Sequence, residues 1–318
     1  AECPQRVGVV CRSQVRGQGL DEIEIEGAGA PDRRLVPGAR ARGVGSVQRM
    51  DAPLRLIATD LDGTLFDADH RLSTRTIDAL RAAHAVGIRV VAATGRSSRS
   101  TVPRLRPAGV IDVAVCSNGS LIHDLASDET IERFPIEPDH VARFFEALAM
   151  LDLDLSFCWE TDRGNGWDDG FADVAALHSD LDGGLVVPER PGASDAVTKI
   201  MVRHHRFVRE ELMAEIAPHI PHGLTMSCSG VEFVEVTGAG VDKAAGLQHL
   251  CAAWGIAADE VIAFGDSHND APMLAWAGTG IAVANASDTA RSVADDVIGH
   301  HADDAVAEHI ESIVASVS

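Results

Sequence analysis

The chain has 318 residues, of which 48 are acidic and 27 basic, so its formal net charge is −21. This length accommodates one large domain or two of ordinary size, and a hydrophobic content of 46% is that of a globular protein. An acidic surface disfavours nonspecific binding to nucleic acid or to an anionic membrane, so we expect neither partner. A small anionic substrate is not excluded, because the local charge of a site can oppose the net charge of the protein.

The cysteines give no sign of a zinc site, a redox motif or a disulfide framework. None belongs to a CxxC pair, and the six are spread along the chain (Cys3, Cys11, Cys116, Cys158, Cys228 and Cys251). We therefore expect reduced cysteines and a cytoplasmic location. The chain also lacks a run of about eighteen apolar residues, so we expect no membrane span.

Residues 1–50 differ in texture from the rest of the chain. They are rich in Gly and Arg, show no sustained hydrophobic period, and lack the apolar region of a secretory signal. We interpret residues 1–50 as a disordered extension or as residues foreign to the natural protein, whose start would then be Met50. A functional basic tail is the alternative.

From residue 54 onward, short apolar runs alternate with helical segments. The segment 72–87 predicts a helix with Ser73 as its N-cap and Gly87 as its C-cap. Buried strands are predicted for the apolar runs at 54–58, 88–94, 112–119, 261–266 and 281–286. This alternation predicts an α/β fold with a doubly wound parallel sheet, covered by helices on both faces.

The pattern changes between residues 136 and 236. A helix is predicted at 141–151, and half-exposed antiparallel strands are predicted at 153–160, 196–205, 223–230 and 231–236. We interpret residues 136–236 as an α+β domain inserted into a core made of residues 51–135 and 237–318. This insert is called the cap below.

Polar residues and glycines follow the strands of the predicted core sheet. Ligands of such sheets bind beyond the carboxyl ends of the strands, so these residues are expected to gather at one site. They are Asp60 and Asp62 after the first strand, Thr94 and Gly95 after the second, Asn118 after the third, and Asp266, Asn269 and Asp270 after a later one.

The pair Asp60 and Asp62 admits two interpretations. Aspartates after a strand are common turn formers and helix caps, so a lone D-x-D is weak evidence of chemistry. Two carboxylates at the end of a buried strand favour a compensating cation, and Mg²⁺ binds through one or two carboxylates, waters and a substrate phosphate. One carboxylate could then attack phosphorus, and the other could handle the proton.

Four motifs in order carry a specific resemblance. The segments "DLDGT", "TGR", "GVDKAAGL" and "GDSHND", with a large insert after the second, resemble the haloacid dehalogenase superfamily of phosphohydrolases, in its Cof-type branch. The resemblance extends from about residue 53 to residue 318. It implies a Rossmann-like core with an α/β cap, Mg²⁺ as cofactor, and a small phosphorylated molecule as substrate.

The resemblance also implies a role for each matched residue. Asp60 would be the nucleophile, and Asp62 would be the general acid and base. The phosphate group would be held by Thr94, Gly95, Lys243, Asn269 and Asn118. The Mg²⁺ ion would be held by Asp60, Asp62 through its backbone carbonyl, Asp266 and Asp270.

Two details of the pattern carry alternatives. Lys199, on a predicted cap strand, competes with Lys243 for the phosphate-binding role, and we favour Lys243 because a helix start also favours an anion. The segment from Phe157 to Phe171 contains Trp159 and Trp167 among glycines. It is either a loop facing the substrate or a solvated turn with its tryptophans anchored in the cap.

The resulting prediction is a Mg²⁺-dependent phosphatase that hydrolyses small phosphorylated metabolites, in the first place sugar or related phosphomonoesters, through an aspartyl phosphate. A sugar phosphomutase on the same fold is one alternative, and a non-catalytic phosphate-binding protein is another. The sequence gives no indication of the oligomeric state.

Overall fold

The computed structural model describes residues 53–172, 185–186, 190–192, 194–229 and 232–317. The interpretation of residues 1–50 as an extension therefore lies outside the described residues. Among the residues described, no helix is both long enough and apolar enough to cross a lipid bilayer.

The larger sheet has eight strands in the order β14-β13-β12-β1-β2-β3-β4-β5. The strands from β14 to β3 run parallel, whereas β4 and β5 pair antiparallel at one edge. Their bounds are β1 Leu56–Thr59, β2 Arg89–Ala93, β3 Val113–Cys116, β4 Leu121–Asp124, β5 Glu129–Arg133, β12 Val261–Gly265, β13 Thr279–Ala282 and β14 Asp296–Val297.

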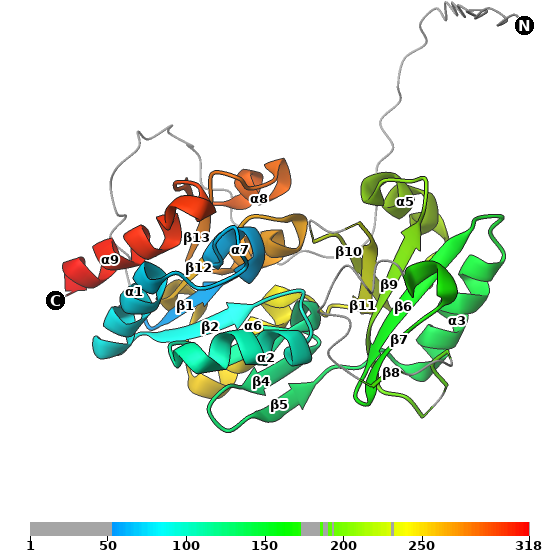
Figure 1. The fold of residues 1–318 in the computed structure, drawn as a ribbon, viewed down its shortest axis with the longest axis horizontal. Helices are drawn as coiled ribbons and strands as arrows, with labels where there is room; N and C mark the ends of the chain where they lie inside the picture. The colour runs from blue at the N-terminus through cyan, green and yellow to red at the C-terminus, as the bar shows by residue number, and fades with distance from the viewer. Residues whose placement is uncertain (1–52, 173–184, 187–189, 193, 230–231, 318) are drawn as a thin grey trace, which may run out of the picture. The chain divides into compact units, whose positions relative to one another are not determined.

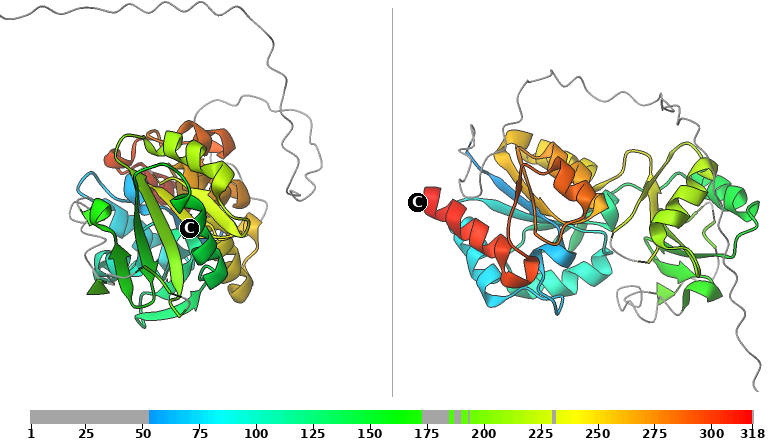
Figure 2. Two further views of the ribbon diagram at one scale, coloured as in Figure 1. Left: turned by 90° about the vertical axis from the view of Figure 1, so that its right-hand side faces the viewer. Right: turned by 90° about the horizontal axis from the view of Figure 1, so that it is seen from above.

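Helices cover both faces of this sheet (Figure 2). Helices α1 and α9 pack together, α2 packs on β3, and α6 and α7 contact each other while packing on β3 and β12 respectively. Right-handed connections place α1 and α2 on one face and α7 on the other, because the chain moves in opposite directions from the central β1–β12 pair. The bounds are α1 Thr74–Ala85, α2 Ser98–Leu105, α6 Lys243–Trp254, α7 Ala271–Trp276, α8 Asp288–Val293 and α9 Ala305–Val317.

Local capping explains where the helix after β1 begins and ends. The side chain of Ser73 accepts a hydrogen bond from the backbone N–H of Thr76, as the sequence predicts. The helix ends at Ala85, and Gly87 follows with a φ of 86°. Gly87 therefore supplies the left-handed turn one residue beyond the cap position predicted for it, which Val86 occupies.

A second sheet forms the cap, with strand order β10-β11-β9-β6-β7-β8 (Figure 1). All its pairs are antiparallel except β7 with β8. The predicted α/β core with an inserted α+β cap is thus confirmed as the fold class. The cap elements are α3 Pro138–Ala149, β6 Leu155–Thr161, β7 Gly164–Trp167, β8 Leu185–Val186, β9 Val197–His204, α5 Arg209–Ile216, β10 Leu224–Ser227 and β11 Val234–Gly238.

The two faces of the cap sheet differ in chemistry. Side chains alternate along a strand, and on β6 Phe157 and Trp159 join the apolar cluster under α3 and α5. The intervening Cys158 belongs to a separate small cluster, and Glu160 is buried with Lys199. One face of the sheet is thus a hydrophobic core, whereas the other carries buried charge.

The tryptophans of the segment between Phe157 and Phe171 pack inside the cap. Trp159 is 1% exposed within the main cap cluster, and Trp167 packs against the small cluster that contains Phe171. The segment folds as the β6–β7 hairpin. Its tip meets the core where Arg99 donates to the backbone oxygen of Asp162.

Candidate active site

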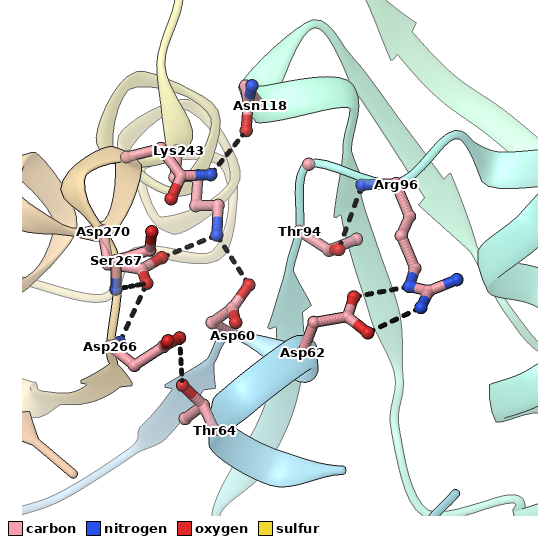
Figure 3. Close-up of polar contacts among 12 residues, drawn as sticks. Asp60, Asp62, Thr64, Thr94, Arg96, Asn118, Lys243, Asp266, Ser267 and Asp270 are labelled. Atoms are coloured by element: carbon pink, nitrogen blue, oxygen red, sulfur yellow. Dashed lines mark hydrogen bonds and ion pairs between the residues drawn. The ribbon is translucent and has the colours of Figure 1, made fainter. Parts of the chain in front are cut away.

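The carboxyl ends of β1 and β12 bring three aspartates together. Asp60 follows β1, while Asp266 and Asp270 follow β12 (Figure 3). One carboxylate oxygen from each lies within 4.8 Å of the others. The strands β1 and β12 are far apart in the sequence, since Leu56 pairs with Val261, and their adjacency in the sheet is what makes this cluster.

Lys243 is the cation of the site. As the first residue of α6, it follows Asp242, whose side chain caps the helix by accepting from Ala245 N–H. Its Nζ donates to an oxygen of Asp60 and to one of Asp270, each at 2.6 Å, and the residue is 1% exposed. Burial alone would lower the pKa of Lys243, but the charges of Asp270 and Asp60 outweigh it and raise the pKa. Lys243 is therefore held as a charged ammonium beside Asp60.

The cluster carries more negative charge than Lys243 neutralises. Burial strongly raises the pKa of Asp60; Lys243 opposes this, and Asp270 and Asp266 add to it. Burial, followed by the charge of Asp270, raises the pKa of Asp266 to about 6. Three aspartates beside one lysine thus carry negative charge that a further cation can neutralise. Oxygen donors alone suit a hard ion such as Mg²⁺, so the residues present fit the predicted metal.

Asp62 lies apart from this cluster and faces Arg96. The carboxylate accepts from Nε and Nη2 of Arg96 and contacts Nδ1 of His70 at 2.9 Å (Figure 3). Burial alone would raise the pKa of Asp62, but hydrogen bonds and charge from Arg96, with a smaller contribution from His70, hold it below its ordinary value. The motif "TGR" contains Arg96, but no pattern in the sequence pairs this residue with Asp62.

The loop between β1 and α1 is tied to Asp266. Gly63 has a φ of 78°, and a Cβ atom there would lie 2.7 Å from an oxygen of Asp266. Thr64 donates to the other oxygen of that carboxylate at 3.0 Å, and the Gly63 carbonyl accepts from Asn285 at 2.7 Å. Glycine is needed here for conformation and for space. The sequence analysis assigned no role to Asn285, which lies in the segment 281–286 predicted as a strand.

The remaining predicted phosphate ligands line the ends of β2 and β3. Thr94 is 1% exposed, and its hydroxyl accepts from Arg96 N–H. The backbone carbonyl of Gly95 accepts a hydrogen bond from Lys199. This contact therefore links Gly95 to the cap. Asn118, in a left-handed conformation with φ 55°, accepts from the Asn269 amide at 2.9 Å. Asn118 and Asn269 thus link the ends of β3 and β12.

Lys199 lies in a different ion cluster on the charged face of the cap sheet. Its Nζ is 3.2 Å from Glu160 and 3.0 Å from Glu235, and it donates to the Gly95 carbonyl at 2.7 Å. Glu160 also accepts from the hydroxyl of Ser117. Burial alone would lower the pKa of Lys199, but the two glutamates raise it overall. The cluster joins the cap to the loops after β2 and β3.

We expect Gly119→Ala to destabilise the protein through the start of α6. Gly119 has a φ of 96°, and an added Cβ would lie 2.0 Å from the backbone oxygen of Asp242, the residue before Lys243. The left-handed conformation alone costs about 1–2 kcal/mol for an L residue, and overpacking adds about 1–3 kcal/mol. Urea denaturation measures the loss.

Gly87→Ala is the matched control for this substitution. Its φ is 86°, and nothing lies within 4 Å of an added Cβ, so it reports the backbone term alone. Equal losses of stability in the two variants would show that the contact with Asp242 carries no strain.

Comparison with known proteins finds relatives of this chain among phosphatases. A family model described as haloacid dehalogenase-like hydrolase matches residues 57–310. The chain is 27% identical over 250 residues to a 5-amino-6-(5-phospho-D-ribitylamino)uracil phosphatase of Bacillus subtilis (strain 168), covering 79% of this chain and 92% of the relative. It is 31% identical over 249 residues to a phosphoglycolate phosphatase of Natronomonas pharaonis, covering 78% and 91%. A solved structure of a phosphatase of this superfamily from Bacteroides thetaiotaomicron matches with a TM-score of 0.70 and 26% identity, covering 87% of this chain and 100% of that one.

Proposed function

The chain belongs to the haloacid dehalogenase-like hydrolases and is a phosphoric monoester hydrolase, and we propose that it is a Mg²⁺-dependent phosphatase of small phosphorylated metabolites. The observation that carries this proposal is the position of Lys243 between Asp60 and Asp270, with Asp266 beside them. Phosphoryl transfer depends mainly on positioning and on neutralising charge, and this arrangement supplies both.

The proposed reaction has two steps. A carboxylate oxygen of Asp60 attacks phosphorus, the bond from phosphorus to the ester oxygen breaks, and Asp62, once it has separated from Arg96 and taken up a proton, gives that proton to the departing alcohol. Asp62 then takes a proton from water, the water oxygen attacks phosphorus, and the bond to Asp60 breaks to release phosphate. Lys243 neutralises phosphoryl oxygens throughout, while Thr94 and Asn118 border the same space.

The metal would be held by Asp60, Asp266 and Asp270, together with the backbone carbonyl of Asp62. When bound, Mg²⁺ supplies positive charge that offsets the negative charge of the phosphoryl group and of the aspartates. The set of carboxylate oxygens found within 4.8 Å of one another supports this assignment.

The range of substrates is set by the cap. The relatives named above act on a phosphoribityl compound in one case and on phosphoglycolate in the other, so likeness alone does not select a substrate. A cap that is joined to the core through the cluster of Lys199, Glu160 and Glu235 would favour small molecules over a folded protein as substrates.

Phosphate release from a panel of phosphate esters tests the function. We expect Mg²⁺-dependent release from a few sugar, polyol, cofactor or related phosphates, and a fall to background when the metal is removed with a chelator. The panel includes 4-nitrophenyl phosphate, whose good leaving group reports a working site even without a fitted substrate. Folded protein that releases no phosphate from any ester with Mg²⁺ would favour a phosphomutase or a non-catalytic binder instead.

We place this activity in the cytoplasm. Four cysteines are free and buried among the residues described: Cys116, Cys158, Cys228 and Cys251. Free cysteines are usual where thiols are kept reduced, and phosphorylated metabolites are made in the same compartment.

A further inference from the structure

A cavity of about 350 Å³ lies next to the phosphate site. Asn118, Asn269 and Lys243 line one end of it, and Lys243 also contacts Asp60. A phosphate ester placed for attack by Asp60 would therefore direct its alcohol into this cavity. The volume is near the lower limit for ligand pockets, which fits a single ring system with its substituents and not a nucleotide.

The wall away from the phosphate end is apolar and rich in sulfur. Met213 on α5, Met226 on β10 and Cys228 after β10 line it, and we call these three residues the sulfur wall. Cys228 Sγ and Met213 Sδ are 3.4 Å apart. Val241 and Pro272 extend the apolar surface. Methionine and cysteine sulfurs make favourable contacts with aromatic rings and adapt to their shape.

Three polar side chains near this wall accept hydrogen bonds from the protein. Thr225 accepts from Gly240 N–H, Asp242 accepts from Ala245 N–H, and Ser227 accepts from the Asn118 amide. The side chains of the sulfur wall offer no strong hydrogen-bonding group, so a polyhydroxylated sugar seated on them would lose hydrogen bonds to water that they do not replace. Glu210 and His268 also line the cavity and can meet a ring nitrogen or a single hydroxyl.

We propose that the substrate is a phosphate monoester whose alcohol carries a compact aromatic or heteroaromatic ring, seated on the sulfur wall. This inference rests on the proposed phosphatase function and narrows it. It also departs from the sugar phosphates that the sequence favoured, because the sequence could not show which side chains surround the alcohol.

The test compares specificity constants for esters of primary alcohols. Benzyl phosphate and pyridoxal 5′-phosphate carry rings, whereas ribose 5-phosphate and glycerol 1-phosphate carry hydroxyls, and 4-nitrophenyl phosphate reports a working site. We expect kcat/KM for the aromatic esters, called ring esters here, to exceed that for the sugar and glycerol esters by at least about tenfold. A pocket whose polarity matches the substrate supplies a ratio of this size.

A substitution in the sulfur wall tests whether that wall causes the preference for ring esters. Met226→Gln keeps the length of the side chain and replaces the sulfur end with an amide, so the ring-to-sugar ratio should fall by about tenfold, mainly through a higher KM for ring esters. Met150→Gln is the matched control, because Met150 is 85% exposed and outside the cavity. Thermal midpoints of both variants verify that they are folded.

The outcomes separate the two claims. Faster cleavage of the sugar ester, or an unchanged ratio in folded Met226→Gln, overturns the ring specificity and leaves the phosphatase standing. Failure to cleave any ester, including 4-nitrophenyl phosphate, overturns the phosphatase and the ring specificity with it.

Discussion

Asp60→Asn is expected to abolish turnover while leaving the protein folded. The variant lacks the carboxylate proposed to attack phosphorus, and loss of a nucleophile lowers kcat by at least about a thousandfold. The amide oxygen of asparagine can still accept from Lys243, which lies 2.6 Å from Asp60. The substitution also removes one negative charge from a buried cluster, so the thermal midpoint should be equal to or above that of the wild type. Single-turnover kinetics and a thermal scan measure both effects.

Ligand binding and a matched control complete this experiment. Calorimetry with inorganic phosphate and Mg²⁺ should still detect binding to Asp60→Asn, since Lys243, Asn118 and Asp266 are unchanged. Asp69→Asn makes the same chemical change at an exposed position on the following loop and should leave kcat unchanged. Turnover of Asp60→Asn comparable to that of the wild type would disprove the nucleophile assignment.

The sequence was enough to predict that the polar residues of the site lie close together, because one physical rule determines their position. Parallel strands end at a common edge, so polar residues that follow them meet whatever their separation along the chain. Asp60, Asp266 and Asp270 obey this rule and come together with Lys243. The antiparallel pair β4 and β5 was missed. The edge strand β5 has no buried residue and so lacks the apolar run that marks a buried strand, and β4 has only two apolar residues, Leu121 and Ile122.

The pairing of individual charges could not be predicted. Asp62 faces Arg96, and Lys199 faces Glu160 and Glu235, although the chain contains many other acidic partners. The pairs of Lys199 depend on strand register: Glu160 lies directly opposite Lys199 in the β6–β9 ladder. A shift by one residue would turn Lys199 to the apolar face of the cap sheet. No local pattern of sequence fixes such a register.

The second large effect is expected from the two buried lysines, which form a natural pair for comparison. Lys243 and Lys199 are 1% and 3% exposed, and each contacts two carboxylates. Replacing either lysine with methionine leaves two buried carboxylates without their cation, which costs about 3–5 kcal/mol. Both variants should therefore lose similar stability in urea denaturation.

Activity should separate these variants. Lys243→Met removes the charge beside Asp60 and should lower kcat/KM by about 10²–10³-fold, as loss of a charge-stabilising donor does. Lys199→Met affects the site only through the lost bond to the Gly95 carbonyl, one residue from Thr94, so the loss of kcat/KM per folded molecule should stay within about tenfold. Assays below the unfolding transition, corrected for the folded fraction, measure this difference. A larger loss in Lys199→Met would reassign the phosphate-binding lysine.

A fully apolar replacement of the cap cluster tests the reason for the stability loss. A buried ion cluster replaced by apolar side chains of similar size is often as stable as the original, because no charge is left without a partner. The triple variant Lys199→Met, Glu160→Leu and Glu235→Leu should therefore regain most of the stability that Lys199→Met alone loses. It should also keep its phosphatase activity within about tenfold, since the cluster of Asp60, Lys243 and Asp270 is untouched. If the triple variant is no more stable than Lys199→Met, the ion cluster itself holds the cap in place, and the loss does not come from stranded carboxylates.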